Sequence, residues 1–237
     1  MDLGGKGWLR AAGVLVGVWA VLLGLVVGAG WLITHTGRAE VNGFDDPISR
    51  WFADSRDPTL GHVADVGTYL GETVVGVTLV VLTGLGFALW RRTWRPLVFV
   101  VLVEAGIGGF YAIATAADPR QRPPVRILDP GLVPDASFPS GHTATATALA
   151  LCVLLLTRAY AARAVRWVTP VLLVPVFTAV ARLYQGAHHL TDVLTSMAYA
   201  SVWVITVAAV VLPAAERRVS PRPRAQEGDR DAATVTP

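Results

Sequence analysis

The chain has 237 residues, of which 53% are hydrophobic and only 16% are charged. Soluble domains are about 25% charged, so this composition disfavours a soluble protein, and the high hydrophobicity excludes an intrinsically disordered chain. The single cysteine excludes an intramolecular disulfide and cysteine-based metal sites, and a net charge of +3 is too small to indicate a nucleic-acid partner.

Six apolar segments follow one another along the chain, each close to the length of a membrane-spanning helix. They cover residues 11–33, 73–90, 96–115, 143–157, 167–184 and 193–212. The first is longer than the apolar core of a signal peptide, so we expect it to be retained. The sequence therefore predicts an all-α, polytopic membrane protein. Residues 1–212 form one domain with six transmembrane helices, and residues 213–237 form a disordered tail.

The connection between the first two spans, residues 34–72, is long and contains amphipathic sequence. Asp46 is a candidate N-cap, and Pro47 suits the first position of a helix. Trp51 and Phe52 follow, and aromatic residues of this kind favour the membrane interface. We therefore predict a short helix that begins at Asp46 and lies in the interface.

The distribution of Lys and Arg indicates the orientation in the membrane. Thirteen basic residues lie on the side that holds both termini, and seven lie on the other side together with most of the acidic residues. The richer side is expected to be cytoplasmic. The connections 34–72, 116–140 and 185–191 are then expected to face outward from the cytoplasmic membrane.

Three polar clusters lie in or beside the outward connections: residues 120–124, 138–142 and 182–192. Any one of them alone reads as a solvated loop or an interfacial segment. Together they place several arginines and histidines at the same ends of the helices. This combination predicts a site that binds an anion and has groups for acid–base chemistry.

The residue types point to phosphate as the anion. The guanidinium of arginine matches phosphate oxygens in shape and charge. Ser140 and Gly141 directly precede the fourth span, where backbone N–H groups and the helix dipole favour a phosphate. His188 and Asp192 are four residues apart and share one helix face, so the carboxylate can orient the imidazole for nucleophilic attack. His142 can then protonate the leaving oxygen. These parts suffice for phosphoryl transfer through a phosphohistidine.

In these three clusters the sequence resembles the type 2 phosphatidic acid phosphatase (PAP2) superfamily. The pattern of that family is K-x6-R-P, then P-S-G-H, then S-R-x5-H-x3-D. Arg122-Pro123 matches the end of the first motif, residues 139–142 match the second in full, and Arg182, His188 and Asp192 match the third. The motifs lie within residues 115–192, and the resemblance covers about residues 73–212.

The resemblance implies a role for each matching residue. His188 corresponds to the nucleophile, Asp192 to its orienting acid and His142 to the general acid. The phosphate-binding set implied by the family is Arg122, Arg182, Ser140 and Gly141. The family implies neither a metal nor a cofactor, and the sequence shows no clustered carboxylates beside the histidines.

Two positions depart from the family pattern. Thr115 stands where the family has Lys, and Ala181 stands where it has Ser. Arg120 and Arg126 are candidates to replace the missing charge, and Arg120 is favoured because it lies two residues from Arg122. His189, next to the nucleophile, is interpreted as a spectator at the interface.

These features predict a lipid phosphate phosphatase that acts at the outer face of the cytoplasmic membrane, with polyprenyl (undecaprenyl) diphosphate as the first-choice substrate. Phosphatidate and phosphatidylglycerophosphate are the alternatives within the family. A non-catalytic lipid-phosphate binder or transporter is the alternative from another class. A haloperoxidase shares the phosphate pocket but is disfavoured by the six apolar spans. The sequence carries no signal for an oligomeric state.

Overall fold

The computed structural model describes residues 5–213, so the predicted tail lies almost entirely outside the described residues. The six apolar segments appear as α1 (Gly5–Thr34), α4 (Thr73–Arg91), α5 (Arg95–Ala117), α6 (Gly141–Tyr160), α8 (Leu173–Tyr184) and α9 (Leu190–Val211). Six helical stretches are long and apolar enough to cross a membrane. The prediction of an all-α polytopic protein is confirmed.

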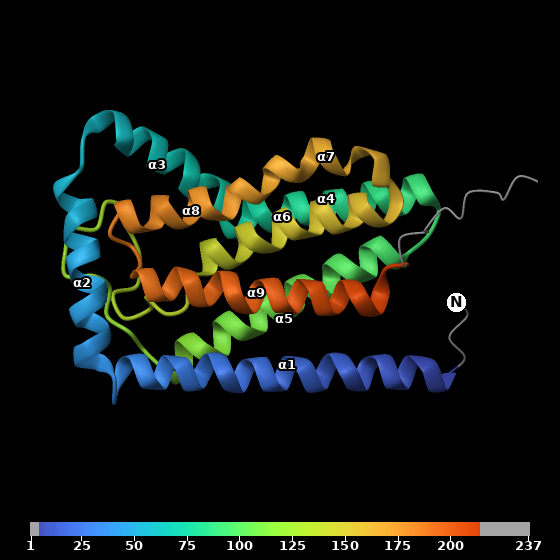
Figure 1. Cartoon of the computed structure of the whole chain (residues 1–237), viewed down its shortest axis with the longest axis horizontal. Helices are drawn as coiled ribbons and strands as arrows, with labels where there is room; N and C mark the ends of the chain where they lie inside the picture. Colours follow the sequence, from blue (N-terminus) through green and yellow to red (C-terminus); the bar gives the residue numbers. More distant parts are fainter. Residues whose placement is uncertain (1–4, 214–237) are drawn as a thin grey trace, which may run out of the picture.

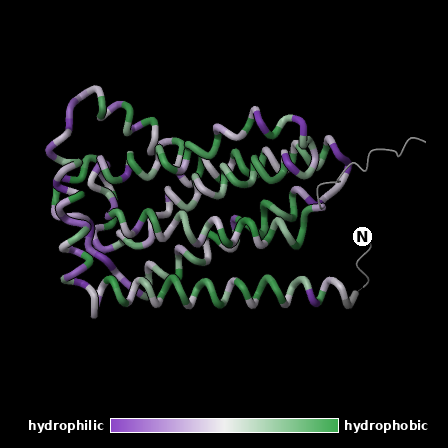
Figure 2. The backbone as a smooth tube through the Cα atoms, viewed as in Figure 1, coloured by the Kyte–Doolittle hydropathy of each residue, from purple (hydrophilic) through white to green (hydrophobic). Residues whose placement is uncertain are grey.

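The spanning helices lie side by side along the long axis of the molecule, with α1 at one edge (Figure 1). In its most apolar window α6 is 61% buried, whereas α1 is 6% buried. The first turns of α6 carry mainly Ala and Thr, and such small side chains let neighbouring helices approach closely. Apolar residues run along the helices, and hydrophilic residues gather at the ends (Figure 2).

The core beneath the site is aromatic and tightly packed. Phe110 stacks against Trp19, with 5.3 Å between the ring centroids, and lies 5.1 Å from the ring of Tyr199. The indole of Trp203 lies where a side chain at Gly106 would be, so α5 and α9 approach closely at this glycine. This packing holds the middle of α5 against α9.

The fifth span is not one regular helix. It begins with η1 (Ala162–Ala164), α7 (Val165–Val168) and η2 (Thr169–Leu172), and α8 follows. Pro170 lies in η2. Proline lacks the N–H that would continue an α-helical hydrogen-bond pattern, which explains the break. The regular part, α8, is the segment that leads to the site.

The helix predicted to begin at Asp46 begins earlier. Helix α2 (Arg38–Asp54) has Gly37 as its N-cap, and Pro47 lies inside it. The predicted start at Asp46 is therefore wrong. Trp51 is 64% exposed, as an interfacial residue should be, and α2 covers the end of the bundle at which the site lies (Figure 1).

A second helix in this connection, α3 (Pro58–Gly71), was not predicted. Its N-cap is Asp57, whose carboxylate accepts hydrogen bonds from the N–H groups of Thr59 and Leu60. An Asp-Pro pair is a recognisable helix start, so the signal was present in the sequence. Helix α3 packs along α8, where the Thr178 hydroxyl donates to the carbonyl of Gly67 at 2.9 Å.

Candidate active site

The connection between α5 and α6 aligns the first two motifs. The N–H of Arg120 donates to the carbonyl of Asp135 at 2.8 Å, and that of Arg122 donates to the carbonyl of Pro134 at 3.0 Å. The N–H of Ser137 returns to the carbonyl of Arg120, also at 3.0 Å. Two segments of this connection therefore run beside each other, and they carry the arginine motif to the start of α6.

His188 lies in the short connection between α8 and α9 and is only 3% exposed. Its Nδ1 is 2.6 Å from the carbonyl oxygen of Ser137. A carbonyl only accepts hydrogen bonds, so Nδ1 carries the proton and Nε2 keeps its lone pair. Burial lowers the pKa of His188 to about 4, and the charges of Arg182 and Arg122 act in the same direction. The imidazole is therefore neutral at pH 7, with one nitrogen available as a nucleophile.

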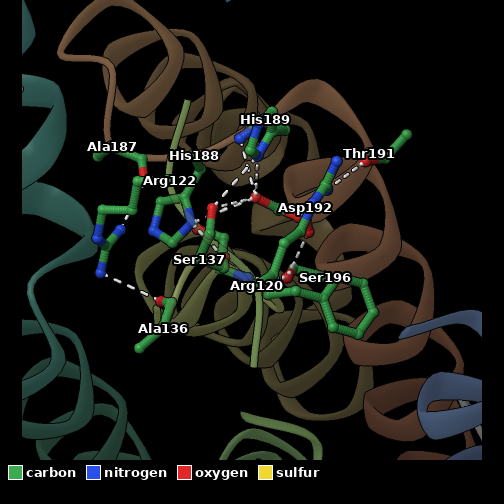
Figure 3. Close-up of polar contacts among 12 residues, drawn as sticks. Arg120, Arg122, Ala136, Ser137, Ala187, His188, His189, Thr191, Asp192 and Ser196 are labelled. Atoms are coloured by element: carbon green, nitrogen blue, oxygen red, sulfur yellow. Dashed lines mark hydrogen bonds and ion pairs between the residues drawn. The ribbon is translucent and has the colours of Figure 1, made fainter. Parts of the chain in front are cut away.

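Asp192 does not hold His188 in the way that the spacing predicted. Its Oδ2 is 3.8 Å from Nδ1 of His188, beyond hydrogen-bond distance. The same oxygen accepts from the Ser137 hydroxyl at 2.6 Å and from the N–H of His189 at 2.8 Å. Asp192 thus orders two groups beside His188, and the Ser137 carbonyl orients the His188 ring itself (Figure 3).

His189 is not a spectator at the surface. It is 3% exposed and is the N-cap of α9, in a reciprocal capping arrangement with Asp192. The ring nitrogen Nδ1 lies 3.4 Å from Oδ2 of Asp192. His189 therefore fixes where α9 begins, and with it the position of Asp192.

Arg120, predicted to replace the missing lysine, lies between two carboxylates. Its Nη2 lies 2.8 Å from Oδ2 of Asp45, and its Nη1 lies 2.5 Å from Oδ1 of Asp192. Nη1 also donates to the hydroxyl of Thr191 at 2.7 Å. Two buried carboxylates neutralise this guanidinium, so its charge belongs to the scaffold that holds Asp192.

Arg182 has the strongest signature of an anion-binding group. Its side chain is completely buried. Nη1 donates to Oδ2 of Asp129 at 2.7 Å and to Oε1 of Gln185 at 3.0 Å. Nε and Nη2 are buried and have no partner among the described residues. Leaving buried donors unsatisfied costs free energy, so these two donors favour the binding of an anion.

Arg122 is held by three backbone carbonyls, those of Val133, Ala136 and Ala187. Its pKa is lowered, first by burial and then by the nearby charge of Arg182. A second arginine close enough to act in this way indicates two converging cations, and the ring of His188 lies between Ser137 and Arg122 (Figure 3). Two cations at one site are stabilised when an anion binds between them.

The start of α6 supplies the backbone part of the site. Ser140 is its N-cap, and the N–H of Ser140 donates to the hydroxyl of Ser196 at 2.8 Å. In the described part of the chain, the N–H groups of Gly141 and His142 have no protein acceptor. A Cβ on Gly141 would lie 3.2 Å from the ring of Tyr111. Glycine therefore leaves this helix start open for an anion.

The residues at the two departures from the family pattern contact other parts of the protein. The hydroxyl of Thr115 donates to the carbonyl of Phe138 at 3.3 Å. Ala181 packs against Gly67 of α3 and forms a small apolar cluster with Ala64 and Tyr184. Thr115 supplies no positive charge in place of the family's lysine. The small side chain of Ala181 fits the tight contact with α3.

Sequence reasoning missed three residues of the site. Ser137 orients His188, Asp129 pairs with Arg182, and Glu72 contacts His142 with 3.1 Å between Oε2 and Nε2. None of them stands in a recognisable motif, and Glu72 lies 70 residues before its partner. Within residues 5–213 no group of three or more His, Cys, Asp or Glu is arranged to hold a metal ion.

We compared the sequence and the structure with those of known proteins. The sequence profile of the PAP2 superfamily matches residues 93–215. The chain belongs to the PAP2 superfamily. The structure is similar to the crystal structure of a transmembrane PAP2-type phosphatidylglycerolphosphate phosphatase from Bacillus subtilis, with a TM-score of 0.67 and 23% sequence identity over 82% of this chain and 94% of the other. No curated protein sequence matches the chain.

Membership of the PAP2 superfamily confirms the predicted family and supports the predicted enzyme class, a phosphatase. The similar crystal structure confirms the transmembrane PAP2 fold. Of the predicted site residues, the structure brings His188, Arg122, Arg182 and the start of α6 together.

Proposed function

We propose that this PAP2 protein hydrolyses lipid phosphates without a metal ion, through a phosphohistidine on His188. The observation that carries the proposal is the pair of unpartnered donors, Nε and Nη2, on the buried guanidinium of Arg182. His188, with a lone pair on Nε2, is close enough for the charges of Arg182 and Arg122 to lower its pKa. A phosphate at this point meets both a nucleophile and the charge that stabilises it.

The proposed chemistry has two steps. Nε2 of His188 attacks phosphorus, the N–P bond forms, and the bond from phosphorus to the lipid oxygen breaks while His142 gives that oxygen a proton. Water then attacks the phosphohistidine and passes a proton to His142. The N–P bond breaks, and inorganic phosphate leaves with both histidines restored. The arginines and the N–H groups at the start of α6 stabilise the charge on the phosphoryl oxygens in both steps.

Polyprenyl diphosphate is the proposed first substrate. The site lies at the ends of the spanning helices, so a phosphate headgroup reaches it while an apolar tail remains in the bilayer. The described chain is a compact set of helices without a separate domain for a large headgroup. Phosphatidylglycerophosphate is the second candidate, because the similar Bacillus subtilis structure is named for that substrate. Phosphatidate is the third.

We further propose that the site faces outward from the cytoplasmic membrane, with both termini in the cytoplasm. Basic residues are concentrated in the connections at the other ends of the helices, among them Arg91, Arg92, Arg158, Arg163 and Arg166. Such an excess marks the cytoplasmic side. A reporter fused after Leu212 should therefore report the cytoplasm. A report from the opposite side reverses the orientation and removes a role at the outer leaflet.

The test is phosphate release by the detergent-purified protein in EDTA. Polyprenyl diphosphate, phosphatidate and phosphatidylglycerophosphate are compared at equal mole fraction in the micelles. We expect release from at least one substrate, a loss of about 10³-fold or more in His188→Ala, and a ³²P-labelled protein that survives an alkaline quench. Full activity in His188→Ala contradicts the nucleophile. Tight substrate binding without release by the unaltered protein favours the non-catalytic binder instead.

A further inference from the structure

The proposed general acid, His142, has a carboxylate partner that lies outside the family motifs. Oε2 of Glu72 is 3.1 Å from Nε2 of His142. Glu72 is the residue between α3 and α4, and it precedes the matched region, residues 93–215. The other charged groups that act on His142 are Arg182 of α8 and Asp129 of the connection before α6. Glu72 is the one whose side chain is hydrogen-bonded to the ring.

The backbone on which Glu72 stands is docked tightly against the start of α6. A Cβ on the preceding residue, Gly71, would lie 2.9 Å from the carbonyl oxygen of His142 and would also overlap the methyl group of Thr178. One turn earlier, the hydroxyl of Thr178 donates to the carbonyl of Gly67 at 2.9 Å. The corner between α3 and α4 is thus held on both α6 and α8. The position of Glu72 beside His142 follows from this packing.

We propose that Glu72 is a positioning residue for leaving-group protonation. It holds His142 through Nε2–H and leaves Nδ1–H as the group that protonates the leaving oxygen. The inference rests on the proposed function. In the first step the Nδ1 proton moves to the lipid oxygen as the bond from phosphorus breaks. The Nε2 proton stays in the hydrogen bond to Glu72, and His142 becomes neutral. In the second step Nδ1 takes the proton of the attacking water.

A purely structural ion pair is the alternative role for Glu72. Its carboxylate is 45% exposed, while the His142 side chain is 17% exposed. Because the Glu72 partner is open to solvent, the pair should contribute about 0–1 kcal/mol to stability, as surface ion pairs do. Replacing Glu72 should therefore leave the fold intact, which allows its effect on the reaction to be measured.

The test compares leaving groups in Glu72→Gln, with Glu40→Gln as the matched control. Glu40 is an exposed acid in the first turn of α2. An alkyl phosphate releases a poor leaving group that needs a proton, whereas p-nitrophenyl phosphate releases a phenolate that needs none. Rapid-quench measurement of the first turnover isolates the step in which the leaving group departs.

We expect Glu72→Gln to slow the first turnover of the alkyl phosphate by about tenfold, a part of the 10²–10⁴ typical of general acid catalysis. The rate with p-nitrophenyl phosphate should change by less than about twofold, and Glu40→Gln should match the unaltered protein on both. An equal loss on both substrates, or no loss on either, overturns the role of Glu72.

A second measurement does not depend on turnover. In ¹⁵N NMR of histidine-labelled protein, neutral His142 should carry its proton on Nε2, and Glu72→Ala should abolish that preference. An unchanged tautomer in Glu72→Ala overturns the inference even if the enzyme is active. If the unaltered protein releases no phosphate but keeps the tautomer preference, the proposed function is contradicted. The Glu72–His142 contact is established in that case.

Discussion

Arg120 and Asp192 form a buried ion pair, with 2.5 Å between Nη1 and Oδ1. Asp45 of α2 pairs with the other end of the same guanidinium at 2.8 Å. Asp45 and Asp192 are completely buried. One arginine thus joins α2, the connection before α6 and the start of α9.

Arg120→Ala should destabilise the protein severely. Removing one partner of a buried ion pair leaves an uncompensated charge and typically costs about 3–5 kcal/mol, and here two carboxylates lose their partner. Thermal unfolding in detergent measures the effect, with Arg126→Ala as the control because Arg126 is exposed. The Arg120→Ala protein could instead unfold at the same temperature as the unaltered one and bind phosphate more weakly. That outcome would place Arg120 in the phosphate pocket.

His188 should remain neutral in mildly acidic solution. Its pKa is lowered to about 4, chiefly by burial, whereas an ordinary histidine has a pKa near 6.5. In ¹⁵N NMR we expect the His188 signals at pH 5.5 to be those of the neutral ring with the proton on Nδ1. Titration of His188 near pH 6.5 contradicts a buried, neutral His188.

The same shift in pKa makes stability depend on pH. Between about pH 4 and 6.5 the unfolded protein binds a proton at His188 that the folded protein does not, so stability rises with pH across this window. Acidification from pH 7 should therefore lower the unfolding temperature. His188→Asn should reduce the slope of that dependence, since it removes the titrating group, and an unchanged slope contradicts the assignment.

Most of the fold and part of the site followed from the sequence alone. The six spans are signalled by long apolar runs, and His188, Arg182 and the start of α6 stand in motifs with fixed spacing. Contacts between distant segments carry no such signal. The Ser137 carbonyl orients His188 through a backbone atom, which residue type does not reveal. Helix spacing favoured a contact between Asp192 and His188, but it held no information on the competing partner, Arg120.

Ser137→Ala should show how the site depends on Asp192. The Ser137 hydroxyl donates to Oδ2 of Asp192 at 2.6 Å, while its carbonyl, which alanine retains, orients His188. We expect a loss of about 1–3 kcal/mol in stability, because the charged acceptor loses one of its donors, and a modest loss of kcat. A loss of kcat as large as that of His188→Ala indicates instead that the hydroxyl takes part in the reaction.

Gly186 and Gly131 offer a matched test of the loop that carries His188. Both have positive φ, +70 and +87, so alanine at either position costs about 1–2 kcal/mol in backbone strain. A Cβ at Gly186 would also lie 3.0 Å from the carbonyl oxygen of Arg126, whereas a Cβ at Gly131 meets nothing within 4 Å.

The crowding at Gly186 reaches the site because Arg56 joins the two sides of the loop. Its Nη1 donates to the carbonyl of Arg126 at 2.8 Å, and its Nε donates to the carbonyl of Tyr184 at 2.9 Å. We therefore expect Gly186→Ala to lower both the unfolding temperature and kcat, since His188 lies two residues further on. Gly131→Ala should lower only the unfolding temperature. Equal kcat values in the two variants would mean that the loop tolerates displacement without moving His188.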